Sequence, residues 1–493
     1  MKTTLTNVIR ACPAIFRLAL LVLANGCAGA ATFDLVLTGG RVMDPATGLD
    51  ARRNIGISAG KIAAISDQVL AGATVINVAG QVVAPGFIDL HAHGQTTSDL
   101  AIKARDGVTT ALELEIGVYP LASWYESMAG KSPINYGATV GHPGARYAAF
   151  RPEARAEVGT SVLGRVGILP RARAAEVLAM EKAIRGGLAE GGLGVGFGIN
   201  YTPTADTAEI EAMFRVAAAA KVPVFVHTRA FGIAAIKEAI DTAKKAKVAL
   251  HIVHVGSSSI GDLREVLPLI DSTKAAGFDI TTEVYPYIAA STRLESAMFD
   301  DGWQKNLGID YGDVVWADTG ERLTKESFTR YRQTGGFVIM YMMKDENIER
   351  AIAHPGVIIA SDGVPFIKGK GHPRGAGTFA RVLGHYSRDK KLLSLMDALA
   401  KMTILPARRL EHVPAMRTKG RIAVGADADL TVFDPATVID RATFEAPTTP
   451  SAGISQVVVN GVVVVRDGEL VKGAMPGRAV RRALQKDLTG PGR

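Results

Sequence analysis

The chain contains 493 residues, of which 47% are hydrophobic and 21% are charged, with 53 Gly and 22 Pro. This globular composition excludes a disordered tail protein, a collagen-like repeat and a polytopic membrane protein. The formal net charge is +8, but no arginine-rich run or basic helix with interleaved aromatic residues accompanies it. We therefore expect a mildly basic protein that does not bind nucleic acid.

Residues 1–30 have the organisation of a secretory signal peptide. A basic segment ends at Arg17, the apolar run 18–24 follows, and the small residues 28–30 suit a cleavage site. The apolar run is too short to span a bilayer, so no integral membrane anchor is expected. We predict export to the periplasm or secretion.

Both cysteines of the chain, Cys12 and Cys27, lie in this leader. Cleavage after Ala30 would leave a protein with no disulfide and no thiolate metal ligand. A lipid anchor on Cys27 is the alternative, although Ala24 stands where a lipoprotein signal usually has leucine.

Short strands separated by turns occupy 31–85 and again 411–493. The expected strands are 33–37, 55–57, 62–65, 75–78, 428–433, 456–459 and 462–465. Asn460-Gly461 joins the last two strands, and this dipeptide is the strongest short hairpin signal because both turn residues take positive φ. The two ends could pair into one small sheet domain.

Between 86 and 410, apolar strands alternate with amphipathic helices. The expected strands are 87–90, 108–115, 138–141, 195–199, 223–227, 250–254, 280–285 and 357–361, with helices such as 174–184, 207–220 and 233–246. Continuous apolar strands with helical crossovers indicate an α/β protein with a parallel sheet, and about eight such units indicate a closed (β/α)8 TIM barrel. The stretch 292–344 interrupts the alternation and is long enough to be an inserted lid.

Polar side chains stand at the ends of the expected barrel strands. His91 and His93 are two residues apart, so a strand period of two points both imidazoles to the same side. His227, His254 and Asp362 end three further strands. A single strand-end histidine is usually a hydrogen-bonded core residue, but four of them with a carboxylate are the ligand types that zinc-like ions take. A metal centre is therefore predicted here.

The expected strand 108–115 carries two carboxylates, Glu113 and Glu115, on one face of an otherwise apolar segment. A buried unpaired carboxylate is costly, so each must be protonated, paired or bound to a cation. Glu115 lies nearer the strand end and is the predicted ligand that bridges two metals. Glu113 is the alternative bridge, and a structural ion pair is the alternative for either residue. His251 faces away from His254 on its strand and is expected to be structural.

Several of these residues carry a family resemblance. The run Val83-Ala84-Pro85-Gly86-Phe87-Ile88-Asp89-Leu90-His91-Ala92-His93, Gly107-Val108-Thr109-Thr110 and the segment 420–430 resemble the amidohydrolase superfamily. Finer matches resemble its D-aminoacylase branch, the N-acyl-D-amino-acid deacylases. These matches are Gly141-His142, the segment 191–203, Tyr285-Pro286-Tyr287, Ser291-Thr292, Ser361-Asp362-Gly363, His372-Pro373-Arg374 and Gly377-Thr378-Phe379.

The resemblance implies a distorted (β/α)8 barrel with a small β-sandwich built from both chain ends. It also implies one or two metal ions, with zinc as the first candidate among divalent metals. In the family's arrangement, His91, His93 and Asp362 hold one ion, and His227 and His254 hold the other.

Two positions depart from the branch. The family's bridging cysteine has no counterpart, and Glu115 is inferred to replace it. The lysine usual two residues after the sixth-strand histidine is Gly256 here, which weakens the expectation of a substrate carboxylate. The resemblance places the substrate-binding residues at Tyr285 or Tyr287, Ser291 and Arg374. It also places His142 near the pocket, with a structural role as the alternative for this histidine.

The predicted chemistry is amide hydrolysis by metal-activated water. A zinc-like ion lowers the pKa of bound water from 15.7 to about 7 and polarises the scissile carbonyl. Asp362 is expected to take the proton of this water and pass it to the leaving amine, as general base and then acid. Tyr287 or a second metal is the candidate for stabilising the oxyanion.

We therefore expect a secreted metal-dependent amidohydrolase that acts on a small-molecule amide, with N-acyl-(D-)amino acids as the first substrate class. The alternative is another hydrolase of the superfamily acting on a dipeptide, a cyclic amide or an aryl amide, which the glycine at 256 favours. A catalytically inactive binding protein is the remote alternative. No feature of the sequence sets the oligomeric state.

Overall fold

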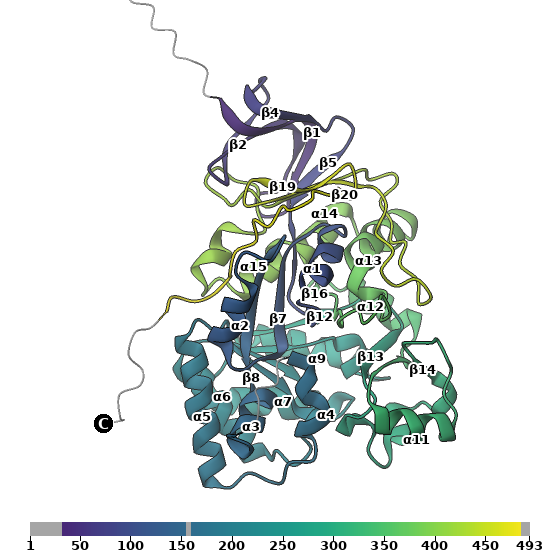
Figure 1. Cartoon of the computed structure of the whole chain (residues 1–493). Coiled ribbons are helices and arrows are strands. Elements are labelled where there is room, and N and C mark those ends of the chain that lie inside the picture. The colour runs from purple at the N-terminus through teal and green to yellow at the C-terminus, as the bar shows by residue number, and fades with distance from the viewer. Residues whose placement is uncertain (1–31, 154–158, 485–493) are drawn as a thin grey trace, which may run out of the picture.

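The computed structural model describes residues 32–153 and 159–484 (Figure 1). The predicted leader, with Cys12 and Cys27, lies outside the described residues. Three sheets organise the chain, with eight, nine and three strands. Within 32–153 and 159–484, every helix falls short of the length and apolarity that a bilayer crossing requires.

The eight-stranded sheet forms the centre of the molecule and is parallel throughout. Its strands, in spatial order, are β16 (Val357–Ile359), β12 (Ile280–Val284), β11 (Leu250–Ile252), β10 (Val224–His227), β9 (Val195–Gly198), β8 (Asn135–Gly141), β7 (Val108–Val118) and β6 (Phe87–Asp89). Every residue of β7 is buried, as expected of a parallel strand that is covered on both faces.

The two outer strands of this sheet, β6 and β16, meet just beyond their carboxyl ends. Ala92 and Gly363 form a parallel bridge there, and the backbone N–H of His93 donates to the carbonyl oxygen of Gly363 at 2.9 Å. The sheet therefore curls into a nearly closed barrel, and the predicted (β/α)8 TIM barrel is confirmed.

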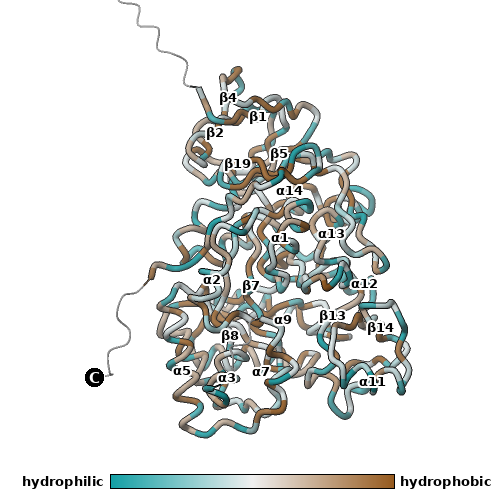
Figure 2. The backbone as a smooth tube through the Cα atoms, viewed as in Figure 1, coloured by the Kyte–Doolittle hydropathy of each residue, from teal (hydrophilic) through white to brown (hydrophobic). Residues whose placement is uncertain are grey.

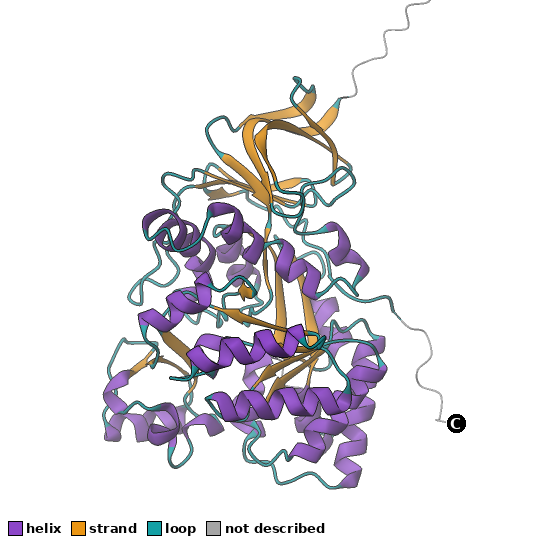
Figure 3. Cartoon of the chain, turned by 180° about the vertical axis from the view of Figure 1, so that it is seen from behind, coloured by secondary structure: helices purple, strands orange, loops and turns teal. Residues whose placement is uncertain are grey.

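Helices surround the barrel strands (Figure 3). They are α1 (Thr97–Ala104), α2 (Leu121–Met128), α3 (His142–Phe150), α4 (Leu163–Val166), α5 (Ala174–Ala189), α6 (Thr207–Ala219), α7 (Ile233–Ala246), α8 (Val255–Ser258), α9 (Leu263–Ala275), α12 (Asp345–Ala353), α13 (Arg374–Arg381), α14 (Leu395–Met402) and α15 (Ile404–Arg409). The predicted helices 174–184, 207–220 and 233–246 correspond to α5, α6 and α7. Asp206 caps α6 because its side chain accepts the N–H of Glu209 at 2.9 Å.

Both chain ends contribute to the nine-stranded sheet. Its strands are β1 (Phe33–Asp44), β2 (Leu49–Ser58), β3 (Lys61–Ser66), β4 (Gly72–Asn77), β5 (Val82–Pro85), β17 (Leu430–Phe433), β18 (Ile454–Val459), β19 (Val462–Arg466) and β20 (Glu469–Leu470). The antiparallel pair β5–β17 joins the two halves, with Val82 opposite Phe433. Asn460 and Gly461 make the predicted β18–β19 hairpin with φ of 49° and 81°. Figure 2 shows apolar colour along β5 and β19, among other elements.

The predicted lid, 292–344, overlaps a small layer beside the barrel. A three-stranded antiparallel sheet forms it in the order β13 (Ala289–Arg293), β15 (Phe337–Tyr341) and β14 (Val314–Trp316), with α10 (Trp303–Leu307) and α11 (Lys325–Thr334) around it. Trp303 stacks on Phe328 at 5.1 Å between ring centroids, and Trp316 stacks on Tyr331 at 4.3 Å. The two tryptophans of this insertion therefore serve its own packing.

Candidate metal centre

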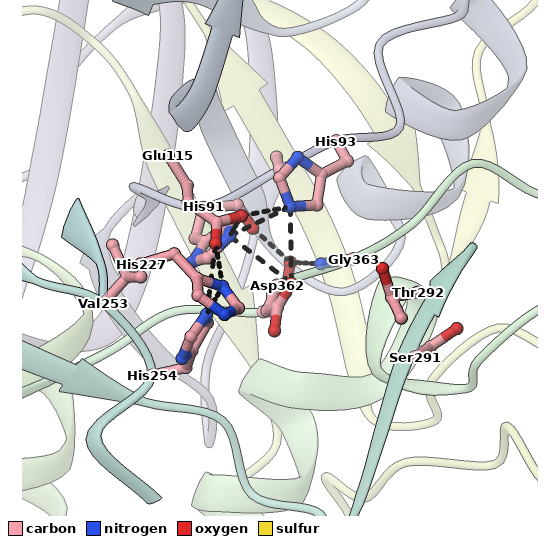
Figure 4. A network of polar contacts seen from close by, with 12 residues as sticks. His91, His93, Glu115, His227, Val253, His254, Ser291, Thr292, Asp362 and Gly363 are labelled. Carbon is pink, nitrogen blue, oxygen red and sulfur yellow. Dashed lines mark hydrogen bonds and ion pairs between the residues drawn. The ribbon is translucent and has the colours of Figure 1, made fainter. Parts of the chain in front are cut away.

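The carboxyl ends of five barrel strands converge on one point (Figure 4). His91 and His93 follow β6, Glu115 lies in β7, His227 ends β10, His254 follows β11 and Asp362 follows β16. All six side chains are buried, and the structure brings every predicted ligand residue to this point. This is the barrel face at which catalytic residues collect in TIM-barrel enzymes.

The first ligand set contains His91, His93, Glu115 and Asp362. The Nε2 atoms of His91 and His93 each lie 3.0 Å from Glu115 Oε2 and 3.4 Å from Asp362 Oδ1. Ligands held 2.0–2.1 Å from a tetrahedral ion are about 3.3 Å apart. The spacing of this set therefore fits a zinc-sized ion.

The second ligand set contains His227, His254 and Glu115. Glu115 Oε1 lies 2.7 Å from His227 Nδ1 and 3.2 Å from His254 Nε2. The two oxygens of this one carboxylate thus face different imidazole pairs, which is the arrangement of a bridging ligand. Glu113 has a different contact, because its Oε2 accepts from His93 Nδ1 at 2.7 Å.

Each imidazole of the first set also has a carboxylate behind it. His91 Nδ1 donates to Glu283 Oε1 at 2.5 Å, and His93 Nδ1 donates to Glu113. Such partners fix the ring orientation and leave Nε2 free as the ligating atom. His251, expected to be structural, contacts Glu283 Oε2 through Nε2 at 3.1 Å.

The charges in the centre depend on one another. Burial opposes the charged form of His91, but the carboxylates of Asp362, Glu283 and Glu115 raise its pKa to about 10. Burial also opposes ionisation of Asp362, yet Arg374 and His91 hold its pKa well below the usual range. By contrast, burial lowers the pKa of His227. The buried carboxylates therefore favour positive charge at this point of the barrel.

Backbone geometry at the strand ends aims these side chains inward. His254 and Asp362 have positive φ, 36° and 50°, a conformation that costs about 1–3 kcal/mol for residues other than glycine. Gly196 in β9 allows β7 to approach closely, since a Cβ there would lie 2.3 Å from the carbonyl oxygen of Glu115. The backbone is therefore strained at two of the candidate ligand residues, His254 and Asp362.

A pocket opens beside the centre. Its polar lining includes Tyr201, Ser257, Tyr285, Ser291 and Thr292, next to the ligand residues. Its apolar lining is formed by Ile116, Leu163, Phe231, Ala290, Met298, Phe337, Met340, Met342 and Val364. Much of this apolar wall comes from the insertion that carries β13 and β15.

The predicted substrate-binding residues fall into two groups. Tyr285 and Ser291 line the pocket, and Ser291 Oγ is buried without a hydrogen-bond partner in the described part of the chain. Arg374 lies behind the pocket wall, where its Nη1 is 3.0 Å from Asp362 Oδ2 and its guanidinium stacks 4.5 Å from the Tyr285 ring. The arginine therefore neutralises Asp362 in this state.

Tyr287 and His142 do not line the pocket. The Tyr287 hydroxyl donates to Asp440 at 3.4 Å, and Arg381 stacks over its ring. His142 begins α3, where its Nε2 lies 2.9 Å from Glu209 Oε1 and its ring stacks on Phe197. Both residues have structural partners in this arrangement, and the oxyanion role expected of Tyr287 has no support from its position.

Sequence reasoning missed two residues of the site. Glu283, a carboxylate within the apolar strand β12, carries the same signal that singled out Glu113, and it could have been found in that way. Tyr201 lines the pocket, hydrogen-bonds Thr292 at 3.0 Å and packs against the His227 ring. No pattern in the sequence points to Tyr201, because it ends a single 3-10 turn, Ile199–Tyr201, directly after β9.

A model of the amidohydrolase family matches residues 74–465 of the chain. The chain belongs to the amidohydrolase family. This amidohydrolase is 33% identical over 500 residues to N-acyl-D-glutamate deacylase of Alcaligenes xylosoxydans xylosoxydans, a match covering 91% of the chain and 96% of the relative. It is 34% identical over 488 residues to the D-aminoacylase of the same organism, with 91% and 98% covered.

A solved structure shows the same architecture. N-acyl-D-glutamate deacylase from Bordetella bronchiseptica, complexed with zinc and a phosphonate inhibitor that mimics the tetrahedral reaction intermediate, matches with a TM-score of 0.79. The identity is 29%, and the match covers 92% of this chain and 100% of that one. The predicted D-aminoacylase branch is confirmed, and the amidohydrolase is a metal-dependent hydrolase of C–N amide bonds.

Proposed function

We propose that this amidohydrolase removes the acyl group from N-acyl-D-amino acids, using one or two zinc ions held by the two ligand sets. The observation that carries the proposal is the position of Glu115, whose two oxygens face the two imidazole pairs beside a pocket. The names of the relatives, which are deacylases of N-acyl-D-amino acids, support this substrate class. The zinc in the Bordetella bronchiseptica structure supports the choice of metal.

The chain's own residues have separate tasks in this reaction. When bound, a divalent ion supplies positive charge that lowers the pKa of water to about 7 and polarises a carbonyl group. Asp362 accepts the proton of the attacking water and returns it to the leaving nitrogen, and Arg374 holds this carboxylate in place through Oδ2. The Ser291 hydroxyl, which has no hydrogen-bond partner among the described residues, binds the substrate in the pocket.

Neutral amides are the second candidate substrate class, and the charge of the pocket favours them. None of its described lining residues is lysine or arginine, and Arg374 is occupied by Asp362. A side chain at Gly256 would start 3.0 Å from Ile348 Cδ1 and 3.3 Å from Val284 Cγ2, so this position faces apolar packing. A substrate carboxylate would have to draw Arg374 away from Asp362.

A substrate panel tests both classes. Purified, zinc-loaded protein is assayed for amine release from N-acetyl-D- and N-acetyl-L-amino acids, their carboxamides, dipeptides and anilides. We expect the N-acetyl-D-amino acids to be cleaved faster than their L enantiomers. Faster cleavage of the carboxamide than of the parent acid would establish the neutral class instead, and no amine release from any compound would refute both.

We also propose export to the periplasm or beyond. The basic, apolar and small segments of residues 1–30 support this localisation. Cleavage after Ala30 is the main expectation, and a lipid anchor at Cys27 is the alternative.

A further inference from the structure

The barrel closes along a seam between its two outer strands, β6 and β16. These strands stand at opposite ends of the sheet order, and an isolated bridge between Ala92 and Gly363 joins the segments that follow them. His91 and His93 stand on one side of this seam, and Asp362 stands on the other. The distance between these three side chains therefore depends on the contacts that hold the seam closed.

A buried ion pair lies behind the seam. Nζ of Lys103, in α1, is 2.8 Å from Oδ2 of Asp89, at the end of β6, and 2.8 Å from the hydroxyl of Ser361, just after β16. All three residues, which we call the seam cluster, are almost completely buried. A buried ammonium and a buried carboxylate are each costly when unpaired, so Lys103 and Asp89 stabilise each other.

Asp89 contacts both sides of the seam through its two oxygens. Oδ1 accepts the backbone N–H of His91 at 3.1 Å and that of Ser361 at 3.0 Å. Oδ2 accepts the hydroxyl of Ser361 at 2.5 Å and the ammonium of Lys103 at 2.8 Å. This carboxylate therefore fixes the backbone of one candidate ligand, His91, and of the residue that precedes another, Asp362.

The cluster also fixes the residue that follows Asp362. The Ser361 hydroxyl accepts the backbone N–H of Gly363 at 3.0 Å as well as the ammonium of Lys103. A Cβ at Gly363 would lie 2.9 Å from Lys103 Nζ, so the ammonium packs closely against this part of the backbone. Asp362 has a φ of 50°, a conformation that persists only where the surroundings impose it.

We propose that Lys103 is a positioning residue that, with Asp89 and Ser361, holds the seam closed and sets the place of Asp362 opposite His91 and His93. Asp362 Oδ1 lies 3.4 Å from Nε2 of both histidines in this arrangement. The inference rests on the proposed function, in which Asp362 transfers a proton. No member of the seam cluster lines the described pocket, so its loss should affect turnover and not substrate binding.

Amine-release kinetics of Lys103→Met on the best substrate of the panel test this role. Methionine removes the ammonium but keeps an unbranched side chain. We expect kcat to fall about 10–100-fold while KM stays within about twofold, because a displacement of about 1 Å at a reacting group has an effect of this size.

Ser361→Ala tests the same cluster while keeping the ion pair, and it serves in place of Lys103→Met should that variant fail to fold. It should also lower kcat without raising KM. The double variant should lose no more than the weaker single variant, because residues of one network are not additive. Losses that multiply in the double variant would overturn the proposal that these residues act together.

Lys419→Met is the matched control for the loss of a buried lysine. Lys419 is also almost completely buried, with Nζ 2.6 Å from Asp429 and 3.0 Å from Asp427, but it belongs to neither ligand set. Both variants should lower Tm, and only Lys103→Met should lower kcat per folded molecule. A kcat of Lys103→Met within twofold of wild type, or an equal loss in Lys419→Met, would overturn the proposal.

Crystal structures of wild type and Lys103→Met, grown under the same conditions, provide a readout that needs no activity. We expect the bridge between Ala92 and Gly363 to open and Asp362 to move away from His91. An unchanged seam would overturn the proposal. Failure of the wild type to cleave any substrate would refute the proposed function, and the comparison of the two seams would then decide alone whether Lys103 positions Asp362.

Discussion

At the scale of single residues, the proposed function gives Asp362 two roles, as a ligand in the first set and as the group that moves a proton. We predict that Asp362→Asn keeps the fold and lowers kcat by about 10²–10⁴-fold, the usual contribution of a positioned acid or base. Amine-release kinetics on the best substrate of the panel measure the loss, and far-ultraviolet circular dichroism checks the fold.

Asp440→Asn is the matched control for this substitution. Asp440 is also an arginine-paired, largely buried carboxylate, 3.0 Å from Arg381 Nη1, but it does not belong to either ligand set. Its variant should keep kcat within a few-fold of wild type. A wild-type kcat in Asp362→Asn would exclude the proton-transfer role.

The convergence of the candidate ligand residues could be predicted from the sequence where strand geometry fixes the direction of their side chains. His91, His93, His227, His254 and Asp362 all stand at strand ends, and parallel strands bring such ends together. The choice between Glu113 and Glu115 was not predictable in the same way. Both side chains point to one face, and only the three-dimensional position of each imidazole decides which carboxylate lies between the pairs and which lies behind His93.

Side chains in turns were the least predictable residues. Tyr285 and Tyr287 are neighbours across Pro286, yet Tyr285 lines the pocket and the Tyr287 hydroxyl contacts Asp440. The chain leaves β12 at this point, so the alternation that fixes side-chain direction in a strand no longer applies. His142 was assigned by its place after a strand, but its partner Glu209 comes from another helix.

At the scale of elements, the periodicity of the barrel segments predicted strands and helices well. The predicted helix 233–246 has the bounds of α7, and its buried residues recur at the three- and four-residue spacing of an amphipathic helix. The insertion could be recognised from the sequence only as an interruption of the alternation between strands and helices. The pairing of β13 with β15 joins residues more than 40 positions apart, and local pattern carries no information on such contacts.

The insertion has a testable role because it forms the apolar wall of the pocket. Met342 follows β15, is partly buried and lines the pocket. Truncation of an apolar side chain of this size removes about 1–2 kcal/mol of contact with a bound apolar group. We therefore expect Met342→Ala to lower kcat/KM about 5–30-fold for substrates with long acyl or side-chain groups, mainly through KM, as measured across the substrate panel.

Met396→Ala provides the control for the loss of a partly buried methionine. Met396 lies in α14, packs against the main core and does not line the pocket. Its variant should leave kcat/KM unchanged. Equal kcat/KM of wild type and Met342→Ala for every substrate would show that this wall does not contact the substrate.

At the scale of the whole molecule, the two chain ends meet in one sheet. The sequence suggested this pairing because both ends contain short strands separated by turns. The pairing β5–β17 and a shared core that includes Leu37, Ile57 and Val432 confirm this arrangement. The β-rich segments could be located from turns and alternation. The polar contacts that attach this sheet to the barrel could not be predicted from the sequence, because they join residues that are far apart in the chain.

Asp429 is the central residue of that attachment. Its buried carboxylate accepts from Lys419 Nζ at 2.6 Å, from Asn135 Nδ2 at 2.9 Å and from the backbone N–H of Asn460 at 2.7 Å. Asn135 begins barrel strand β8, and Asn460 stands in the β18–β19 hairpin. One side chain thus links the barrel, the hairpin and the segment that carries Lys419.

We predict that Asp429→Ala lowers the free energy of unfolding by about 3–5 kcal/mol, because it leaves the Lys419 ammonium buried without its closest carboxylate. Differential scanning calorimetry should show a lower Tm, while kcat of the folded protein stays unchanged because Asp429 lies outside both ligand sets. Asp427→Ala is the matched control: it also contacts Lys419, at 3.0 Å, but its other partner, Lys61, is exposed, so the loss should be smaller. Equal Tm values for the two variants would mean that Asp429 does not hold the sheet on the barrel.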